Sequence, residues 1–378
     1  MDLAGIYRIL FSAWGSAASK LPAGLAPPPL QLFFEISDRC NLKCGFCFYR
    51  HDIGSRGGGE VLRPREVERA IHEIPSARLV AFAGAEPFCR ADFMEMLEAA
   101  ARRRIASVET NGTMISGDLA RRLVRMAFNP SRMTGLASID ASLHGPAAVH
   151  DRITGAKGSF GKIEAALRAL HAARSEAGRR FPLIHVKTVI CGENAAALSE
   201  TRRLAAEMGA DAFLLKLRDP FPMSFRVANG APIVRRPPAG KRGPRRGLGQ
   251  PAPEGRGTRG APAFPAAALA QELKKIRAAK KGPPLITLPL NLDDEAVLAH
   301  YSDGGDGLDR YSCSSPWTRV SVMPYGDVFF CKLFGHGNVR QEGLAKSWNS
   351  EPARAFRRRL SSGPLPPECK GCCFLTRQ

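Results

Sequence analysis

Short apolar runs alternate with amphipathic stretches from residue 31 to residue 217. Six of the runs have the length of strands, and the segments between them place apolar side chains at helical spacing. In 159–177, for example, apolar residues recur from Phe160 to Leu170 before Gly178 interrupts the pattern. The predicted strands cover residues 31–37, 79–83, 105–110, 135–143, 183–190 and 212–217. Repeated strand–helix alternation predicts an α/β fold with a parallel sheet, in the form of a partial (β/α)6 TIM-like barrel.

The rhythm changes after the sixth predicted strand. Residues 218–263 are rich in Pro, Gly and Arg and have too few apolar residues to bury a core, so we expect an insertion or flap. A helical pattern returns at 266–280, and from about residue 300 aromatic residues, glycines and cysteines predict a separate C-terminal module. We therefore divide the chain into an N-terminal helical extension, a barrel core, the insertion, a last barrel helix with connector, and the C-terminal module: 1–30, 31–217, 218–263, 264–299 and 300–378.

Two predicted features depend on single residues. Asn194 is expected to cap a helix over 194–208 that ends at Gly209. His185 lies within an alternating strand and is expected to be structural. Near the N-terminus, Asp2 and Arg8 interrupt an apolar stretch that would otherwise resemble a signal peptide, so we expect a surface helix there and a cytoplasmic protein.

The charge, the length of the apolar runs and the positions of the cysteines indicate which partners the protein could bind. The formal net charge is +20, which favours anionic partners such as acidic peptides, phosphorylated metabolites or nucleic acid. No apolar run approaches the ~20 residues of a membrane span. Eight of the ten cysteines are gathered in two groups toward the ends of the chain, and Cys89 and Cys191 lie between them; this distribution indicates metal binding rather than a disulfide scaffold.

The first cysteine group is Cys40-x3-Cys44-x2-Cys47, directly after the first predicted strand. Three thiolates in one loop can ligate three irons of a 4Fe–4S cluster and leave the fourth iron open to a small molecule. A zinc site is the alternative, with His51 as a fourth ligand, although structural zinc usually takes four closed ligands. The cysteine spacing favours an iron–sulfur cluster, and a zinc site remains the alternative.

The run ISDRCNLKCGFCFYR resembles the cluster loop of the radical S-adenosylmethionine (AdoMet) superfamily. Further motifs of that family follow later predicted strands: Gly84-Ala85-Glu86-Pro87, Thr110-Asn111-Gly112-Thr113, and the stretch beginning Ser142-Leu143-His144. In a parallel barrel the carboxyl ends of the strands share one face, so these motifs should converge. The resemblance implies a cluster on Cys40, Cys44 and Cys47 and AdoMet contacts from Phe46, Gly84, Ala85, Glu86, Pro87, Asn111 and Ser142.

Three departures from the family pattern bear on the AdoMet contacts. Ala85 stands where relatives have a second glycine, which matters little if its φ stays negative. His144 and Thr154 stand where many relatives carry Asp and Arg, in the region that meets the ribose.

The second cysteine group resembles the SPASM/Twitch class of C-terminal iron–sulfur modules. Cys313-x12-Gly326-x4-Cys331 predicts a hairpin turned by Gly326, and Cys369-x2-Cys372 follows. The cysteine count fits the shorter Twitch form, with one auxiliary 4Fe–4S cluster on Cys313, Cys331, Cys369 and Cys372. Cys373 is either a spare thiol or the ligand in place of Cys372, and on spacing alone four cysteines could equally hold zinc.

The resemblance implies an oxidoreductase or maturase. Such an enzyme cleaves AdoMet reductively, uses the 5′-deoxyadenosyl radical to abstract hydrogen from a peptide or small metabolite, and passes an electron to the auxiliary cluster. It needs a reducing partner such as flavodoxin or ferredoxin. Two alternatives remain: a basic RNA-modifying radical AdoMet enzyme, and a non-catalytic zinc-binding interaction protein.

Overall fold

The six predicted barrel strands are present in the computed structural model of the chain. It describes residues 11, 13–47, 49, 60–219, 264–302, 307–332 and 334–377, with the backbone of 227–228 and 231–232. The strands are β1 Gln31–Ser37, β2 Leu79–Gly84, β3 Ile105–Thr110, β4 Gly135–Ser142, β5 Leu183–Val189 and β6 Ala212–Lys216. Each pairs in parallel with the next in chain order. The predicted parallel α/β sheet is therefore confirmed.

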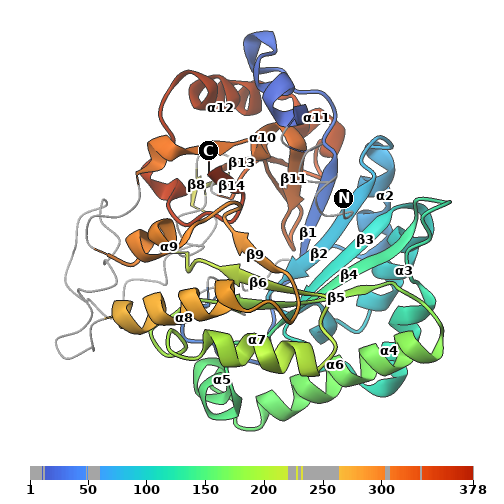
Figure 1. Cartoon of the computed structure of the whole chain (residues 1–378). Helices are drawn as coiled ribbons and strands as arrows, with labels where there is room; N and C mark the ends of the chain where they lie inside the picture. The colour runs from blue at the N-terminus through green and yellow to red at the C-terminus, as the bar shows by residue number, and fades with distance from the viewer. Residues whose placement is uncertain are drawn as a thin grey trace, which may run out of the picture.

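Helices cover the outer, convex face of this sheet (Figure 1). Alternate strand residues such as Val108, Ile139 and Val186 join the helices in one hydrophobic core. The intervening residues face the opposite, inner side, where Asp140 on β4 lies 2.9 Å from the Nδ1 atom of His185 on β5. The covering helices are α2 Pro64–Glu73, α3 Phe93–Arg103, α4 Gly117–Arg125, α5 Ala147–Thr154, α6 Ser159–Glu176, α7 Leu198–Glu207 and α8 Ala266–Ala278.

The sheet is longer than the six predicted strands. After α8 the chain forms β9 Leu285–Leu288, which pairs in parallel with β6 and was not predicted, and then α9 Asp294–His300. At the other edge β11 Arg319–Val322 pairs in parallel with β1, so the sheet runs continuously from the barrel into the C-terminal region. The open barrel is thus extended at both of its edges.

The C-terminal region contains the predicted hairpin. Gly326, at φ +93°, turns the chain between β11 and β12 Asp327–Phe329, which pair antiparallel. The remaining elements are η1 Pro22–Gly24, η2 Pro87–Cys89, β7 Val227–Ala228, β8 Ala231–Pro232, η4 Leu308–Arg310, β10 Tyr311–Cys313, α10 Ser315–Thr318, β13 Phe334–Asn338, α11 Leu344–Trp348, α12 Glu351–Ser362, η5 Pro367–Cys369 and β14 Leu375–Arg377. β10 and β14 pair as a separate small sheet.

One predicted cap was wrong. Helix α7 begins at Leu198, and its cap residue is Ala197. The Asn194 amide instead accepts a hydrogen bond from the backbone N–H of Cys191 and donates to the carbonyl oxygens of His144 and Val189. Asn194 therefore ties the end of β5 to the loop after β4. Most of the predicted insertion 218–263, and residues 1–10, lie outside the described residues. In the part of the chain that is described, no helix is long and apolar enough to cross a membrane.

Arg340 fastens the C-terminal region to α2. Its guanidinium donates to both carboxylate oxygens of Glu66, at 2.7 and 2.8 Å, and to the carbonyl oxygens of Glu60 and Val61. The hydrogen bonds from Arg340 lower the pKa of Glu66 to about 2, although partial burial opposes the shift. Because the pKa is depressed, this pair stabilises the folded protein above the usual carboxylate pKa and ceases to do so as the pH falls toward 2.

We expect Glu66→Gln to lower the free energy of unfolding at pH 7 by about 1–2 kcal/mol, a value reduced from the full pKa shift because both side chains are partly exposed. The deficit should shrink in denaturant titrations of the apoprotein at pH 3. Glu68→Gln, on the same helix beside only an exposed His72, is the matched control and should change little. A deficit that is equal at both pH values would contradict the role of the Glu66 charge.

Candidate functional site

The three N-terminal cysteines lie together in the loop that follows β1. The Cys40 sulfur accepts hydrogen bonds from the backbone N–H of Leu42 at 3.4 Å and from the Asn111 amide at 3.7 Å. Burial raises the pKa of Cys40, and burial together with the charges of Cys47 and Cys40 raises the pKa of Cys44 to about 12. Thiolates that repel one another in this way are stabilised by a bound cation. The donor set therefore fits an iron-containing group.

A cluster and a single metal ion require different arrangements of the three thiols. Within the described ranges, no three His, Cys, Asp or Glu side chains gather as they would around one metal ion. The thiolate ligands of a 4Fe–4S cluster sit on different iron atoms and need no common centre.

The cluster loop rests on the C-terminal end of helix α5. The backbone N–H groups of Lys43 and Gly45 donate to the carbonyl oxygens of Thr154 at 2.9 Å and Ile153 at 3.0 Å. These carbonyls belong to the last turn of the helix and have no partner within it. Gly155 ends the helix at φ +64°, and a Cβ there would lie 3.3 Å from the Lys43 carbonyl oxygen. The loop conformation is thus set by backbone contacts that do not involve the cysteine sulfurs.

The Gly84–Pro87 segment lies directly against the start of the cluster loop. Gly84 has φ +120°, and a Cβ on it would lie 2.8 Å from the Ser37 carbonyl oxygen. The N–H groups of Ala85 and Glu86 donate to the carbonyl oxygens of Ser37 and Arg39, both at 2.9 Å. Ala85 is not among the described residues with positive φ, so its side chain replaces the family's glycine without backbone strain.

Glu86 joins the loops that follow β2 and β3. Its buried carboxylate accepts hydrogen bonds from the Thr110 hydroxyl at 2.7 Å, the Asn111 N–H at 2.6 Å and the Phe88 N–H at 3.2 Å. Burial raises the pKa of Glu86, and these three donors oppose that effect. The carboxylate therefore acts first as an internal acceptor, a role that the sequence did not indicate.

We expect Glu86→Ala to lower the free energy of unfolding by about 3 kcal/mol, because it leaves buried N–H and O–H donors without an acceptor. Glu98→Gln is the matched control: Glu98 pairs with Arg122 at the surface, and its loss should cost under about 1 kcal/mol. Thermal unfolding of the apoproteins measures both. Equal losses would show that the Glu86 hydrogen bonds contribute no more than a surface ion pair.

Asn111 connects the loop after β3, residues 110–113 (the TNGT loop), to the loop after β1 that carries Cys40, Cys44 and Cys47 (the cluster loop). Its amide donates to the Asn41 side-chain oxygen at 2.8 Å as well as to the Cys40 sulfur, and it accepts from the N–H and hydroxyl of Thr113 at 2.9 and 2.7 Å. Asn41 in turn donates to the Thr113 hydroxyl at 2.8 Å. The family motifs after β1, β2 and β3 therefore form one hydrogen-bonded unit.

Aromatic rings continue the site on the β4 side. The Phe46 ring meets the His144 ring edge-on at 4.8 Å, and His144 stacks on His150 at 5.8 Å. Burial lowers the pKa of His144 well below its usual value and that of His150 to about 4, so both rings are neutral at pH 7. The Thr154 hydroxyl is used internally, donating to the His150 carbonyl oxygen. Ser142 is the last residue of β4, two positions before His144.

A second group of cysteines surrounds a cavity of about 570 Å³ in the C-terminal region. Cys313, Cys331, Cys369 and Cys372 line it together, although they come from three separate segments of the chain. Burial raises the pKa of Cys313 to about 11 and that of Cys369 to about 12, and it also raises the pKa of Cys372. Cys373 is not among the lining residues. Four thiols thus line one cavity.

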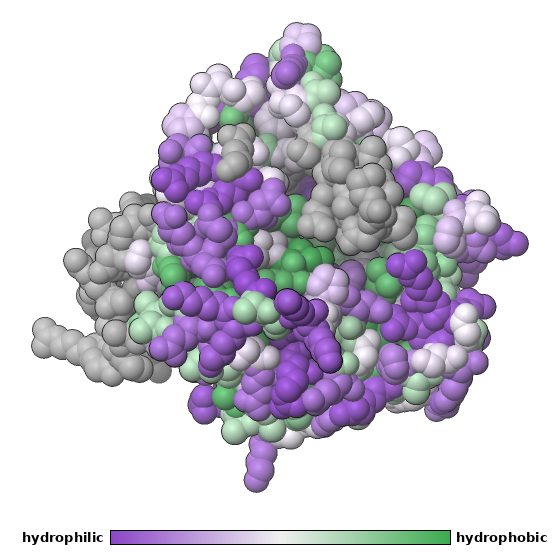
Figure 2. Space-filling view, in the orientation of Figure 1, coloured by the Kyte–Doolittle hydropathy of each residue, from purple (hydrophilic) through white to green (hydrophobic). Residues whose placement is uncertain are grey.

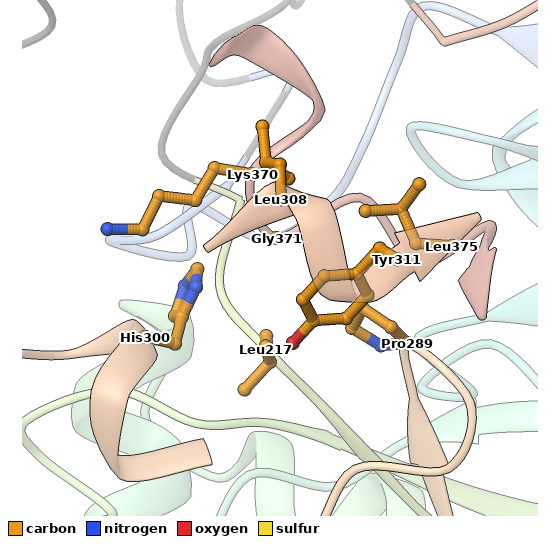
Figure 3. Close-up of a pocket in the computed structure, with 8 residues that line it drawn as sticks. All are labelled: Leu217, Pro289, His300, Leu308, Tyr311, Lys370, Gly371 and Leu375. Carbon is orange, nitrogen blue, oxygen red and sulfur yellow. The ribbon is translucent and has the colours of Figure 1, made fainter. Parts of the chain in front are cut away.

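The cysteine cavity is joined to the barrel at the end of β6. Lys332, which also lines the cavity, forms a largely buried ion pair with Asp219 in the segment after β6. Beside it, a small cavity of about 10 Å³ lies between Leu217, Pro289 and Tyr311, and Figure 3 shows Lys370 extending over His300 at its rim. The C-terminal loop therefore packs against the carboxyl ends of β6 and β9.

The molecular surface on the face drawn in Figure 1 is mostly hydrophilic. Figure 2 shows mainly hydrophilic side chains on this face, with a hydrophobic patch near its middle, in the region between β9 and β1 in Figure 1. This face of the molecule therefore offers both hydrophilic and hydrophobic surface.

Two family models match the chain, and they divide it as the two cysteine groups do. Residues 34–205 match the radical SAM superfamily, and residues 313–373 match the SPASM iron–sulfur cluster-binding domain. The chain therefore belongs to the radical SAM superfamily of AdoMet-dependent iron–sulfur enzymes, in the subgroup that carries a SPASM domain. The cofactors of that subgroup are 4Fe–4S clusters and AdoMet.

Individual relatives are distant. The chain is 26% identical, over 49% of its own length and 50% of the relative's, to a tungsten-containing aldehyde ferredoxin oxidoreductase cofactor-modifying protein of Pyrococcus furiosus. It is 27% identical, over 50% and 43%, to the pre-heme d1 synthase of Dinoroseobacter shibae. The chain thus spans about half the length of these curated relatives or less. Streptococcus suis SuiB bound to the precursor peptide SuiA shares the fold, with a TM-score of 0.59 at 15% identity over 97% of this chain and 75% of SuiB.

Proposed function

We propose that this protein is a radical AdoMet oxidoreductase or maturase that carries out a net two-electron oxidation on a peptide or a small metabolite. The observation that carries the proposal is the presence of two thiol groups in different settings. Three cysteines lie in the loop after β1, among the family's AdoMet motifs, and four others line one cavity near the end of β6.

The residues after β1 would hold the cluster that binds AdoMet. Cys40, Cys44 and Cys47 supply three thiolates, which leaves one iron without a protein ligand. When bound, the cluster and AdoMet supply reductive cleavage and hydrogen-atom abstraction. The chain positions these groups through the Glu86 and Asn111 hydrogen bonds and the Phe46–His144 contact. Gly84, Ala85, Pro87 and Ser142 remain proposed AdoMet contacts.

The four cysteines of the C-terminal cavity would hold the auxiliary cluster. With Cys313, Cys331, Cys369 and Cys372 all as ligands, no iron stays open to substrate, so electron transfer is the role left to this site. A substrate that has lost a hydrogen atom then gives up one electron here and one proton to solvent or to a base. In this scheme one AdoMet is consumed in each turnover. A reduced flavodoxin or ferredoxin would supply the electron for the cleavage of AdoMet.

The substrate class rests on analogy and charge. The names of the relatives point to cofactor precursors, and the SuiB complex contains a peptide. The net charge of +20 favours an anionic member of either class. We also propose that the chain divides into the N-terminal extension, the barrel core, the insertion, the last barrel helix with its connector, and the C-terminal module.

The two alternative functions make different predictions. An RNA-modifying enzyme would bind RNA with a steep salt dependence in a gel shift. A zinc-binding interaction protein would be colourless and would contain zinc and no iron.

The deciding experiment is anaerobic purification of the full chain after reconstitution with iron and sulfide, followed by metal analysis. We expect iron and sulfide for two 4Fe–4S clusters, and formation of 5′-deoxyadenosine from AdoMet under dithionite. Zinc at both cysteine groups, or no cleavage of AdoMet by an iron-loaded protein, would contradict the proposed function.

A further inference from the structure

The side-chain amide of Asn111 is held in one orientation beside Cys40. Its oxygen accepts two hydrogen bonds from Thr113, one from the backbone N–H at 2.9 Å and one from the hydroxyl at 2.7 Å. An amide oxygen with two donors cannot exchange places with the NH2 group without setting donor against donor. The NH2 group must therefore face the other way, toward the Asn41 side-chain oxygen at 2.8 Å and the Cys40 sulfur at 3.7 Å.

The backbone leaves Asn111 little freedom to move away. Its N–H donates to the buried Glu86 carboxylate at 2.6 Å. The next residue, Gly112, has φ +74°, and a Cβ on it would lie 2.1 Å from the Ile163 side chain. The N–H directed at the sulfur is thus fixed by contacts from the loop after β2, from Thr113 and from α6.

The Cys40 sulfur also accepts a hydrogen bond from the backbone N–H of Leu42 at 3.4 Å. Hydrogen bonds to a cluster's cysteine sulfurs stabilise the more electron-rich state, so they favour reduction of the cluster. This effect is electrostatic and does not depend on bound AdoMet.

We propose that Asn111 is a positioning residue of the AdoMet-binding cluster, whose amide N–H, bonded to the Cys40 sulfur, raises the reduction potential of that cluster. The inference rests on the cluster assigned above to Cys40, Cys44 and Cys47. It gives Asn111 a role different from the AdoMet contact that the family resemblance implies. Removing the N–H makes the cluster harder to reduce even when AdoMet is absent.

The test is a potentiometric titration of the reconstituted full chain, followed by electron paramagnetic resonance, without AdoMet. The signal of the AdoMet-binding cluster is identified in a parallel sample as the one that AdoMet changes. The auxiliary cluster in the same sample is the internal reference and should keep its potential. Asn111→Ala should shift the reduction equilibrium of the AdoMet-binding cluster by about tenfold toward the oxidised form, which is about 59 mV for one electron.

Further variants grade the effect. Asn111→Asp, which replaces the donor by an acceptor, should shift the potential in the same direction and at least as far. Thr113→Val removes one of the two bonds that orient the amide and should give a smaller shift of the same sign. Asn129→Ala is the matched control, because the Asn129 side-chain oxygen likewise accepts two backbone N–H groups, from Ser131 and Arg132, in the loop before β4; it should change the equilibrium by less than about twofold.

Two outcomes overturn the inference. One is an unchanged potential in Asn111→Ala and Asn111→Asp proteins that carry their full iron content. The other is a defect confined to the spectral change that AdoMet causes, which would make Asn111 an AdoMet contact alone. A wild-type protein that builds no cluster on its N-terminal cysteines would instead be a failure of the proposed function, so the two failures are distinguishable.

Discussion

Replacing Cys40, Cys44 and Cys47 together with alanine is expected to abolish the formation of 5′-deoxyadenosine while the protein stays folded. These thiols are the only cluster ligands proposed after β1, and without them AdoMet has no iron to bind. The loop itself should persist, because Lys43 and Gly45 anchor it to α5 through their backbones. The measurement is chromatographic detection of 5′-deoxyadenosine under dithionite, with circular dichroism to confirm folding.

Cys89→Ala is the control for this experiment. Cys89 lies close by in η2, but its sulfur contacts Met114 at 3.6 Å and it belongs to neither thiol group. We expect the Cys89 variant to retain AdoMet cleavage. Continued cleavage by the triple variant, which would carry only the C-terminal cluster, would refute the assignment of the N-terminal cysteines.

The second large effect concerns the auxiliary site. Replacing Cys369 and Cys372 with alanine should reduce the iron and sulfide content from two clusters to one and should leave AdoMet cleavage in the absence of substrate intact. With a substrate in hand, the same variant should transfer hydrogen to 5′-deoxyadenosine yet fail to release oxidised product, because the electron has no acceptor. Metal analysis and spectroscopy measure the first effect, and product analysis the second.

Cys373→Ala is the matched control, one residue further along the chain. Cys373 is outside the lining of the cysteine cavity, so we expect both clusters to remain. A wild-type protein with one cluster, or a redox-neutral product, would be incompatible with an electron-accepting auxiliary site. If Cys373→Ala loses the auxiliary cluster and Cys372→Ala keeps it, Cys373 is the cluster ligand in place of Cys372.

The barrel strands could be predicted from the sequence because each is a compact apolar run between helices with clear periodicity. The strand β9 could not, since its four residues lie between prolines, in the stretch GPPLITLPL, and resemble a connector. Its position depends on pairing with β6, which is information that a local pattern does not contain. The Asn194 cap failed for a similar reason: its amide is used by three backbone groups at the ends of β4 and β5.

The same limit applies to the candidate site. The cysteines and the family motifs stand out by residue type and spacing, and strand order predicts that they share one face. What each side chain does there depends on contacts across loops. The acceptor role of Glu86 and the sulfur contact of Asn111 arise between segments about 25 to 70 residues apart, so spacing within a motif gives no indication of them.

The pairing of β11 with β1 has a consequence for how the chain folds. β1 leaves the ribosome well before one of its two neighbours, which is a strand made almost 300 residues later. Closing so long a loop is entropically costly, and topologies rich in such contacts fold slowly. During synthesis β1 therefore exposes an unpaired strand edge, which is a template for pairing with other chains. Final closure of the sheet, and the burial of that edge, must wait for the SPASM segment.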